Sequence, residues 1–493
     1  MAASAAGVVL MALVGSVPRS PYQPVLPAGA GPGGPFAVIA RAVGLDALHG
    51  SALAAAGVAC AAFAAASFLL VLRAAWRGEV RLRTVVILII AYHAIILSLP
   101  LLFSRDVYSY IAYGRIAGVH HANPYVQTPL DFRSDAIFPL VGHKWVGTPA
   151  VYGPFFTLVS ALVTRGIGSI STLIVVFRLV AIAASLGTIG VVAWLTGRLW
   201  PERRVFAIAA LGLNPVVLFN SVASGHNDLL VALSIAGALA LVVVRKDLLA
   251  VIVLTLAALI KASAVLPLVL LIVVIVARSP KGRRLRAFAA PAGLVAALGV
   301  LFAAPFFQMH DPTLGMLELA GHEGWLAPSR FFRRVLDWVS FGTLGVVARL
   351  GFAVLLVVVA VVLARETARR APTLSPLGLG GRWGWALLSL ALLGPVLLPW
   401  YVTWSLPLIW LLPRVPRTVL LATSTALAVS QWAAEPTRFA VTYNVNTVLG
   451  YYVVTPVLVG GLLWLLVDLR RRLREGAPLE DLPEQVPASA GEG

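Results

Sequence analysis

The sequence predicts an all-α polytopic membrane protein. Of its 493 residues, 60% are hydrophobic and only 12% are charged, and the mean hydropathy is +0.92. A water-soluble fold of this size has no interior large enough for so much apolar side chain. Apolar stretches close to the length of a membrane helix recur along the whole chain. These observations together predict a bundle of roughly 11 to 14 transmembrane helices.

The apolar stretches are separated by short polar connections. Several are shorter than the ~20 residues that a full span needs, so the number of spans is given as a range. The first stretch lacks a basic region before it and a good cleavage site after it, so we interpret it as a retained anchor rather than a signal peptide. The stretches lie near residues 5–17, 51–72, 84–103, 171–197, 205–222, 228–244, 248–260, 262–277, 287–306, 340–364, 383–398, 401–413, 418–433 and 448–468.

Seven short connections hold 24 of the 38 lysines and arginines, and the positive-inside rule assigns them to the cytoplasm. Alternation then requires residues 151–165 to form an interfacial helix instead of a span. This topology gives one transmembrane domain, 1–474, with outer loops at 104–170 and 307–339 and a disordered acidic cytoplasmic tail at 475–493. The basic connections are 73–83, 198–204, 245–246, 278–286, 365–382, 414–417 and 470–474.

The formal net charge is +18. The basic residues are distributed as the membrane orientation requires, so no nucleic-acid partner is predicted. The single cysteine, Cys60, excludes an intramolecular disulfide. Membrane lipids are the expected surroundings of most of the surface.

The first outer loop begins with a cluster of polar and aromatic residues, "SRDVYSYIAYGR". Asp106 lies at the predicted membrane surface, where a carboxylate suits a general base that acts on a lipid headgroup. The alternative is a solvated acid at a helix end beside Arg105. Aromatic faces nearby are typical of sugar binding, although interfacial tyrosine belts look similar. The tyrosines of this cluster are Tyr108, Tyr110 and Tyr113.

A second polar group, "SGHNDLL" at 224–230, opens an apolar stretch. A helix N-cap explains Asn227 or Asp228, but it does not explain His226. A metal site built from Asp106, His226 and Asp228 lacks the usual ligand spacing, so no metal is predicted.

Lys261 interrupts a long apolar run at a cost of ~2.5–3.5 kcal/mol on insertion scales, which makes it a candidate functional residue, with snorkelling as the alternative. The topology places it at the outer surface between two short helices, where it suits a phosphate. "RFFRR" adds three cations to an outer loop, against the positive-inside trend, and indicates an anionic partner. These cations are Arg330, Arg333 and Arg334.

One reaction unites these residues. A sugar linked to a lipid phosphate has a leaving group that departs as an anion and needs positive charge instead of a proton. The incoming hydroxyl needs a carboxylate base. One aspartate with lysine and arginine is therefore sufficient for an inverting transfer, in contrast to the carboxylate pair of a retaining glycosidase.

The motifs "SRDVYSYIAYGRIAGVHHANPY", "TPAVYGPFF", "SGHNDLLVAL" and "LIKASAVLPL" resemble those of the GT-C membrane glycosyltransferases. Within them the chain is most similar to actinobacterial polyprenyl-phosphate-mannose-dependent α-1,6-mannosyltransferases, which build lipomannan and lipoarabinomannan cores. The resemblance covers about residues 84–280 and implies a GT-C-like bundle with interfacial helices in the first outer loop.

The resemblance implies that Asp106 is the catalytic base. It carries further site positions onto Tyr108, Tyr110 and Arg115, onto Tyr152, Gly153 and Pro154, onto His226, Asn227 and Asp228, and onto Lys261. Many GT-C enzymes carry two adjacent acids where this chain has Arg105 before Asp106. We therefore predict no metal and no other cofactor, and assign Arg115 to the donor phosphate and Tyr152 to the sugar or acceptor.

The resemblance also implies a polyprenyl-phosphate-linked donor, with mannose as the usual sugar, and a glycolipid or glycan acceptor at the outer face of the cytoplasmic membrane. One rival is a transferase of the same fold that acts on protein or on lipid A-like acceptors. Another is a polyprenyl-lipid flippase or transporter, which predicts charged residues near the bilayer midplane and access to both faces. Most polar candidates gather at one face, which favours the enzyme; Arg178 and Arg349 fit this least well.

Overall fold

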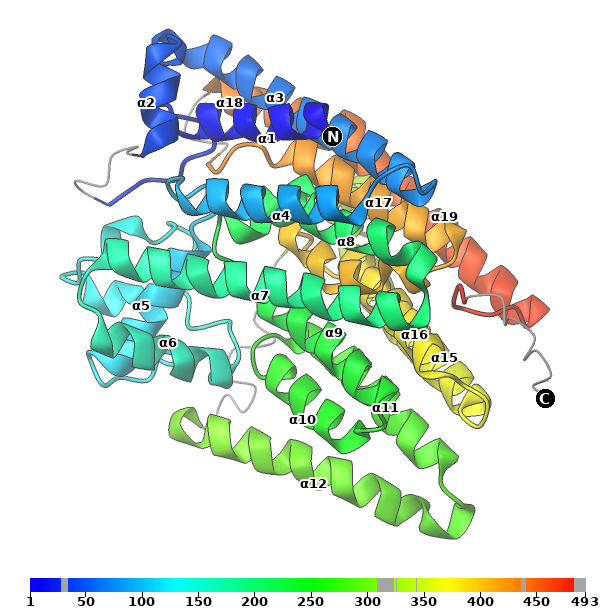
Figure 1. Cartoon of the computed structure of the whole chain (residues 1–493). Coiled ribbons are helices and arrows are strands. Elements are labelled where there is room, and N and C mark those ends of the chain that lie inside the picture. Colours follow the sequence, from blue (N-terminus) through cyan, green and yellow to red (C-terminus); the bar gives the residue numbers. More distant parts are fainter. Residues whose placement is uncertain (28–33, 308–322, 325, 343, 436–439, 483–493) are drawn as a thin grey trace.

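The computed structural model describes residues 1–27, 34–307, 323–324, 326–342, 344–435 and 440–482. In these ranges the chain forms helices and turns and no strand (Figure 1). Helices satisfy their backbone hydrogen bonds internally, as hydrocarbon surroundings demand. The prediction of an all-α polytopic membrane protein is confirmed.

The first half of the chain supplies the elements around the polar motifs. Its helices are α1 (Ala2–Gly15), α2 (Pro35–Ala42), α3 (Gly50–Trp76), α4 (Leu82–Leu97), α5 (Asp106–Gly118), α6 (Pro154–Gly166), α7 (Ile170–Leu199), α8 (Arg204–Gly212), α9 (Asp228–Val243), α10 (Asp247–Ala258), α11 (Val265–Arg278) and α12 (Arg284–Ala303). Short turns between them are η1 (Leu45–Ala47), η2 (Pro129–Phe132), η3 (Phe138–Leu140), η4 (Pro201–Arg203), η5 (Val216–Val222), η6 (Ala262–Ala264), η7 (Lys281–Arg283) and η8 (Ala304–Phe306).

The second half packs against these elements. Its helices are α14 (Pro328–Val339), α15 (Gly345–Arg370), α16 (Pro376–Leu393), α17 (Arg414–Ser430), α18 (Ala440–Val448) and α19 (Thr455–Glu475), with short helices η9 (Pro399–Trp404), η10 (Leu406–Leu411) and η12 (Leu449–Val454). Of the predicted second outer loop, residues 308–322 and 325 lie outside the described residues.

Five described helices are long and apolar enough to cross a membrane, or six if a bent pair at 201–222 counts as one span. Five shorter apolar helices of 10–17 residues accompany them. The chain is thus a multi-pass membrane protein, while the number of 11 to 14 spans stays a prediction.

The apolar stretch 401–413 differs from the other predicted spans. It forms two buried 3-10 helices, η9 and η10, with no α-helix. Three prolines, Pro399, Pro407 and Pro413, break up the helical hydrogen bonding here. This stretch therefore belongs to the protein interior, and η9 brings aromatic side chains to the polar motifs.

Helices α5 and α6 pack closely at one end of α7 (Figure 1). Gly114 and Gly118 permit this approach, because a Cβ at either would lie 2.7 Å from Ser160 O or 2.3 Å from Ala161 O, respectively. Helix α6 occupies most of the segment 151–165 that was predicted to lie at the interface. The pair fixes the orientation of α5, whose first residue is Asp106.

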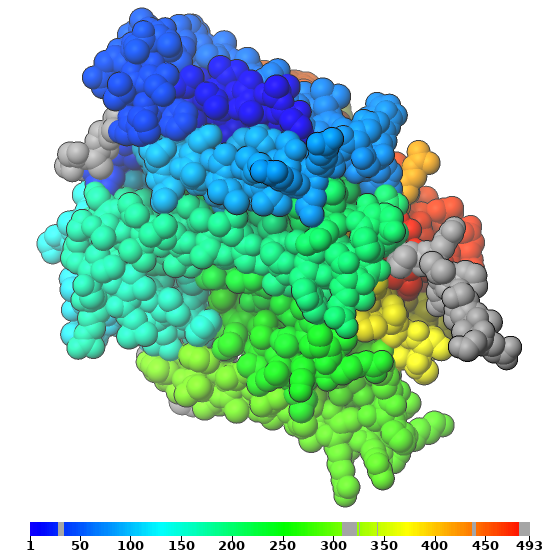
Figure 2. Space-filling view, in the orientation of Figure 1, coloured from blue at the N-terminus to red at the C-terminus, as the bar shows by residue number. Residues whose placement is uncertain are grey.

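The ends of α3, α7 and α11 that carry basic residues lie on one side of the molecule, and α5 and α6 lie on the other (Figure 1). The space-filling view shows the helices as successive bands, from the N-terminal helices at the top to α12 at the bottom (Figure 2). The candidate residues of the first outer loop are thus separated from the basic connections (Figure 1), while the topology across the membrane stays a prediction.

Part of the predicted disordered tail is bound to the helices. Glu480 accepts a hydrogen bond from the buried Arg382 at 2.6 Å, and Trp385 donates to Leu479 O at 2.8 Å. Leu479 itself is 1% exposed. The prediction of disorder from residue 475 does not describe these residues, because Arg382 binds the acidic Glu480 and Leu479 is buried. Residues 483–493 lie outside the described part of the chain.

Candidate active site

Asp106 begins α5 and follows a turn formed by residues 98–105. Phe103 in this turn has a φ of 64°, a strained conformation for a bulky residue, and its amide donates to Tyr22 O at 2.7 Å. The Ser104 hydroxyl donates to Asp106 Oδ1 and accepts from the Asp106 amide, each at 3.1 Å. The carboxylate is therefore fixed at a helix N-terminus, where the helix dipole favours its negative charge.

The "SGHND" motif forms the turn between η5 and α9. Gly225 has a φ of 68°, and a Cβ there would lie 2.7 Å from Val107 Cγ2. Only glycine suits this left-handed position at such a close approach. The turn therefore sits directly against the start of α5 and brings His226 to Asp106.

The two segments meet in one polar cluster. His226 Nδ1 lies 3.5 Å from Asp106 Oδ2 and 3.9 Å from Asp228 Oδ2. The Tyr110 hydroxyl lies 3.3 Å from His226 Nδ1 and donates to Asn227 Oδ1 at 3.3 Å. Five of the predicted site residues thus lie together. Two come from α5 and three from the "SGHND" turn, and more than a hundred positions separate these two segments in the chain.

Lys261 joins the same cluster through Asp228. Its Nζ lies 2.7 and 2.9 Å from the two carboxylate oxygens, and Trp404 Nε1 donates to Asp228 Oδ1 at 2.7 Å. The Asp228 side chain is fully buried and that of Lys261 is 13% exposed. Gly153 holds the turn before Lys261, since its amide donates to Ile260 O at 3.0 Å. This buried ion pair leaves Lys261 one further N–H for a ligand.

Aromatic rings from η9 cover the cluster. Trp400 stacks on His226 with ring centroids 3.8 Å apart, and Tyr401 stacks on Trp404 at 4.3 Å. Lys261 Nζ lies 4.6 Å from the centre of the Tyr401 ring, a cation–π distance. The cations and carboxylates are therefore bounded by flat aromatic faces of the kind that bind sugar rings.

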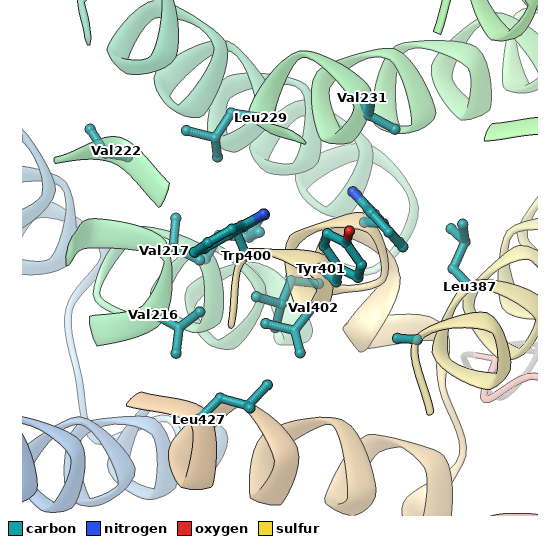
Figure 3. Close-up of a cluster of buried hydrophobic side chains, with 14 of the residues drawn as sticks. Val216, Val217, Val222, Leu229, Val231, Leu387, Trp400, Tyr401, Val402 and Leu427 are labelled. Carbon is teal, nitrogen blue, oxygen red and sulfur yellow. The ribbon is translucent and has the colours of Figure 1, made fainter. Parts of the chain in front are cut away.

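Aliphatic side chains hold these aromatic residues in place. Figure 3 shows Trp400 and Tyr401 among branched side chains, which include Val217 of η5, Leu229 of α9 and Val402 of η9 itself. Trp400 is 5% and Tyr401 6% exposed. The close packing fixes both rings with little rotational freedom.

Three buried nitrogens in the cluster have no hydrogen-bond partner among the described residues: His226 Nε2, Asn227 Nδ2 and Trp400 Nε1. Leaving such groups unpaired costs roughly 1–3 kcal/mol each. Hydroxyl or phosphate oxygens of a bound molecule would satisfy them. These three nitrogens are therefore candidate donors to a ligand next to Asp106.

The surroundings also adjust the ionisation of Asp106. Burial raises the pKa of its carboxyl to about 6, an effect that the Lys261 charge and the Ser104 hydroxyl oppose and Asp228 reinforces. The side chain keeps 25% of its surface exposed, which leaves access for a substrate. Burial and Lys261 lower the pKa of His226 well below its usual value, so His226 is neutral near pH 7. A carboxylate with a pKa of about 6 is suited to accept a proton.

The other predicted tyrosines have structural partners. Tyr108 and Tyr113 donate to backbone carbonyl oxygens at 2.7 and 2.9 Å. Tyr152 packs edge-on against the ring of Tyr110 at 4.8 Å. These residues support the cluster, and their contact with a sugar stays a prediction.

Arg115 lies at the far end of α5 and binds Asp135 instead of Asp106. Its Nε donates to Asp135 at 2.9 Å, and His120 Nε2 lies 2.6 Å from the same carboxylate. Burial opposes ionisation of Asp135, but the amide of Ile137, His120 and Arg115 together lower its pKa. The pairing gives Arg115 a structural role, and its contact with the donor phosphate stays a prediction.

The three arginines of "RFFRR" have different surroundings. Arg333 binds Glu323 at 2.7 Å and Asp337 at 2.8 Å. Arg334 donates to the hydroxyl of Tyr451, and Arg330 Nε is buried without a hydrogen-bond partner among the described residues. No ion pair or hydrogen bond joins these arginines to Asp106 in the described part of the chain.

Four chain segments meet just before α5, through Val25, Arg105, Val141 and Glu435, and we call this set of contacts the clasp. Arg105 Nε donates to Glu435 Oε1 at 2.6 Å, and Arg105 Nη1 donates to Val141 O at 3.4 Å. The amide of Val25 donates to the same Glu435 oxygen at 3.0 Å. The residue that replaces the second acid of many GT-C enzymes therefore binds an acid from the other end of the chain.

Sequence reasoning missed Ser104, Trp400, Tyr401, Trp404 and Glu435. The available signal for the aromatic residues was "PWYVTW", three aromatic residues beside a proline at an outer turn. Within the described residues no group of three or more His, Cys, Asp or Glu is arranged to hold a metal ion. The prediction that no metal is needed stays a prediction.

Comparisons with known proteins connect this cluster to a family. A protein-family model described as "Alpha-(1->6)-mannopyranosyltransferase, N-terminal domain" matches residues 6–278, which is more than half of the chain. The chain is 29% identical over 342 residues to alpha-(1->6)-mannopyranosyltransferase A of Mycobacterium tuberculosis, covering 66% of this chain and 64% of that protein.

A probable alpha-(1->6)-mannopyranosyltransferase of Mycolicibacterium smegmatis is 35% identical over 145 residues, which is 28% of this chain and 25% of the relative. The matches therefore span less than two thirds of the length of these relatives. The family match contains Asp106, the "SGHND" turn and Lys261. The chain belongs to the alpha-(1->6)-mannopyranosyltransferase family.

Proposed function

We propose that this protein is a membrane glycosyltransferase that transfers mannose from a polyprenyl-phosphate donor to a glycolipid or glycan acceptor. The family supports mannose as the sugar. The observation that carries the reaction type is the cluster itself: a partly exposed carboxylate, Asp106, faces a neutral histidine, a buried lysine and unpaired nitrogen donors. These groups match an acceptor hydroxyl, a phosphate and sugar hydroxyls.

In this mechanism Asp106 takes the proton from the acceptor hydroxyl as the hydroxyl oxygen bonds to the anomeric carbon. The bond between that carbon and the phosphate oxygen breaks on the opposite face, and its electron pair leaves with the lipid phosphate. The configuration is inverted, so an α-linked product comes from a β-linked donor. Protonation of the leaving group is unnecessary because a phosphate is stable as an anion.

Lys261 supplies positive charge to the phosphate. Asp228 and Trp404 fix its ammonium group, so the charge needs no rearrangement as the bond breaks. The carboxylates that bind Arg115 and Arg333 leave these two residues out of the proposed phosphate site. Asn227, His226 and Trp400 are proposed to bind sugar hydroxyls with their unpaired nitrogens.

The proposed reaction takes place at the outer face of the cytoplasmic membrane. Positive-inside orientation puts the basic helix ends in the cytoplasm, and α5 and α6 lie on the opposite side of the molecule (Figure 1). Residues 104–170 and 307–339 are accordingly proposed as outer loops of a single transmembrane domain.

The test is transfer in reconstituted liposomes. The wild type should transfer labelled mannose from polyprenyl-phosphate-mannose to a short mannoside, and Asp106→Asn should lose roughly 10²–10⁴-fold in rate. Arg115→Gln is a matched control, because it removes a charge from the same helix at a site bound to Asp135. Full activity of a folded Asp106→Asn protein would refute the base, and absence of transfer by the wild type would refute the donor or the reaction.

A further inference from the structure

A cavity of about 260 Å³ lies apart from the Asp106 cluster, between α14 and the π-helical turn η12. One face of α14 forms its wall, with Arg330, Arg334 and Trp338 spaced four residues apart. Tyr451 of η12 and Thr455 of α19 also line the cavity. The π-helical turn that carries Tyr451 is a rare form of helix that is frequent at functional sites.

The cavity contains positive charge that no carboxylate of the described residues neutralises. In the described part of the chain, the Arg334 guanidinium donates a hydrogen bond to the Tyr451 hydroxyl and lies 4.9 Å from the centre of the Tyr451 ring. Arg330 Nε is buried and has no hydrogen-bond partner among the described residues. Arg333, on another face of the same helix, is by contrast bound by Glu323 and Asp337. Two of the three arginines are thus available to an anion.

The rest of the cavity is apolar and continuous with exposed apolar side chains. Phe331 and Val335 line it beside Trp338, and Trp338 is 82% exposed. Its position matches the membrane surface: α15 and α19 start near the cavity and carry their basic clusters at their far ends, at Arg369 and Arg370 and at 470–474. A ligand with an anionic head and a hydrocarbon chain fits this arrangement.

We infer that the Arg330–Arg334 cavity binds a lipid phosphate monoester, the class to which the spent carrier of the proposed reaction belongs. A phosphate monoester carries about −1.5 to −2 charges near neutral pH, which two guanidinium groups match. A phosphodiester, such as the sugar-linked donor or a bulk phospholipid, carries one negative charge on its phosphate. The cavity therefore selects the product carrier over the donor.

The surroundings connect this cavity to the Asp106 cluster. The amide of Gly324, just before α14, donates to Pro395 O at 2.9 Å, and the chain after Pro395 continues into η9, which carries Trp400 and Trp404. The Arg330–Arg334 cavity would then be a second cationic site for a carrier that is released at Lys261. This identification of the carrier as product rests on the proposed function.

The test is direct binding by native mass spectrometry of the full-length protein, delipidated in detergent. Polyprenyl phosphate and phosphatidylglycerol are titrated separately. The wild type should bind polyprenyl phosphate at least tenfold more tightly. Arg330→Gln with Arg334→Gln should weaken that binding by roughly tenfold or more for each guanidinium removed, while Arg333→Gln, the matched control on α14, should leave it unchanged.

Equal affinity for the two lipids would overturn the preference for a monoester. An equal loss of polyprenyl phosphate affinity in the Arg333→Gln control would show that the lipid responds to any charge on α14, whether or not it lines the cavity. Unchanged affinity in the double variant would refute the proposed site. Thermal unfolding midpoints establish that the variants fold. The binding assay needs no transferase activity, so failure of the proposed function and failure of this inference are separate results.

Discussion

The pH dependence of transfer is expected to report the ionisation of Asp106. Burial raises the pKa of its carboxyl to about 6, and the ionised form is the one that accepts a proton. Roughly nine tenths of the molecules then carry the active base at pH 7 and roughly one tenth at pH 5. kcat/KM should therefore fall about tenfold between pH 7 and pH 5.

Ser104→Ala changes this profile in a defined direction. The Ser104 hydroxyl stabilises the carboxylate by a hydrogen bond at 3.1 Å and so lowers the pKa of Asp106. Its removal should raise that pKa, move the acid limb of the profile to higher pH and leave the rate on the alkaline plateau nearly unchanged. His226 does not contribute to this limb, because its pKa lies well below the usual value.

The assay is mannose transfer in liposomes at a donor concentration well below KM, where the initial rate reports kcat/KM. Rates are measured from about pH 4.5 to 8, which covers an ordinary and a raised carboxyl pKa. A flat profile between pH 5 and 7 would show that Asp106 is not a base with a raised pKa. A limb that moves to lower pH in Ser104→Ala would refute the assigned role of the hydroxyl.

Three further substitutions test the buried ion pair, the α5–α6 contact and the proposed sugar contact of Trp400. Lys261→Met leaves Asp228 buried without its cation and should lower the free energy of unfolding by roughly 3–5 kcal/mol, measured from thermal midpoints in detergent; adding Asp228→Asn should recover part of this loss, and additive losses would contradict the pair. Gly118→Ala should destabilise the α5–α6 contact by about 1–3 kcal/mol, whereas Gly190→Ala, which meets no atom within 4 Å, should not; equal midpoints would argue against close packing. Trp400→Phe keeps a ring beside His226 but removes a buried indole N–H, so KM for donor or acceptor should rise about tenfold at an unchanged midpoint, and an unchanged KM would exclude sugar contact.

Much of the cluster was predictable because its residues are polar in an apolar chain. Asp106, the "SGHND" turn and Lys261 are each costly in a membrane setting, so each was a candidate by itself. Alternation of the spans predicts only that they share one face, and their contact depends on the close packing of Gly225 against the start of α5. Arg115 belongs to the same motif as Asp106, but the two residues lie nine positions apart along the 13-residue helix α5, and Arg115 binds Asp135.

The remaining residues carried no comparable signal. Trp404 lies in the apolar stretch 401–413, which the sequence predicts to be a span, and Trp400 lies just before it. Only the folded chain shows that this region forms 3-10 helices. Glu435 is an ordinary loop acid in the sequence. Its role depends on a contact across 330 positions, which local periodicity does not encode.

The clasp between Arg105 and Glu435 bears on how the protein becomes active during synthesis. Arg105 is synthesised early, whereas Glu435 lies far beyond residue 278, where the family match ends. A ribosome adds residues in order, so the turn before the base gains its last tie only when nearly the whole chain has been inserted. A fragment ending at residue 278 should therefore reach the membrane and transfer no sugar, and co-expression of 279–493 should restore transfer. Timing of insertion would then act as a safeguard, because no half-made chain carries the complete Asp106 cluster.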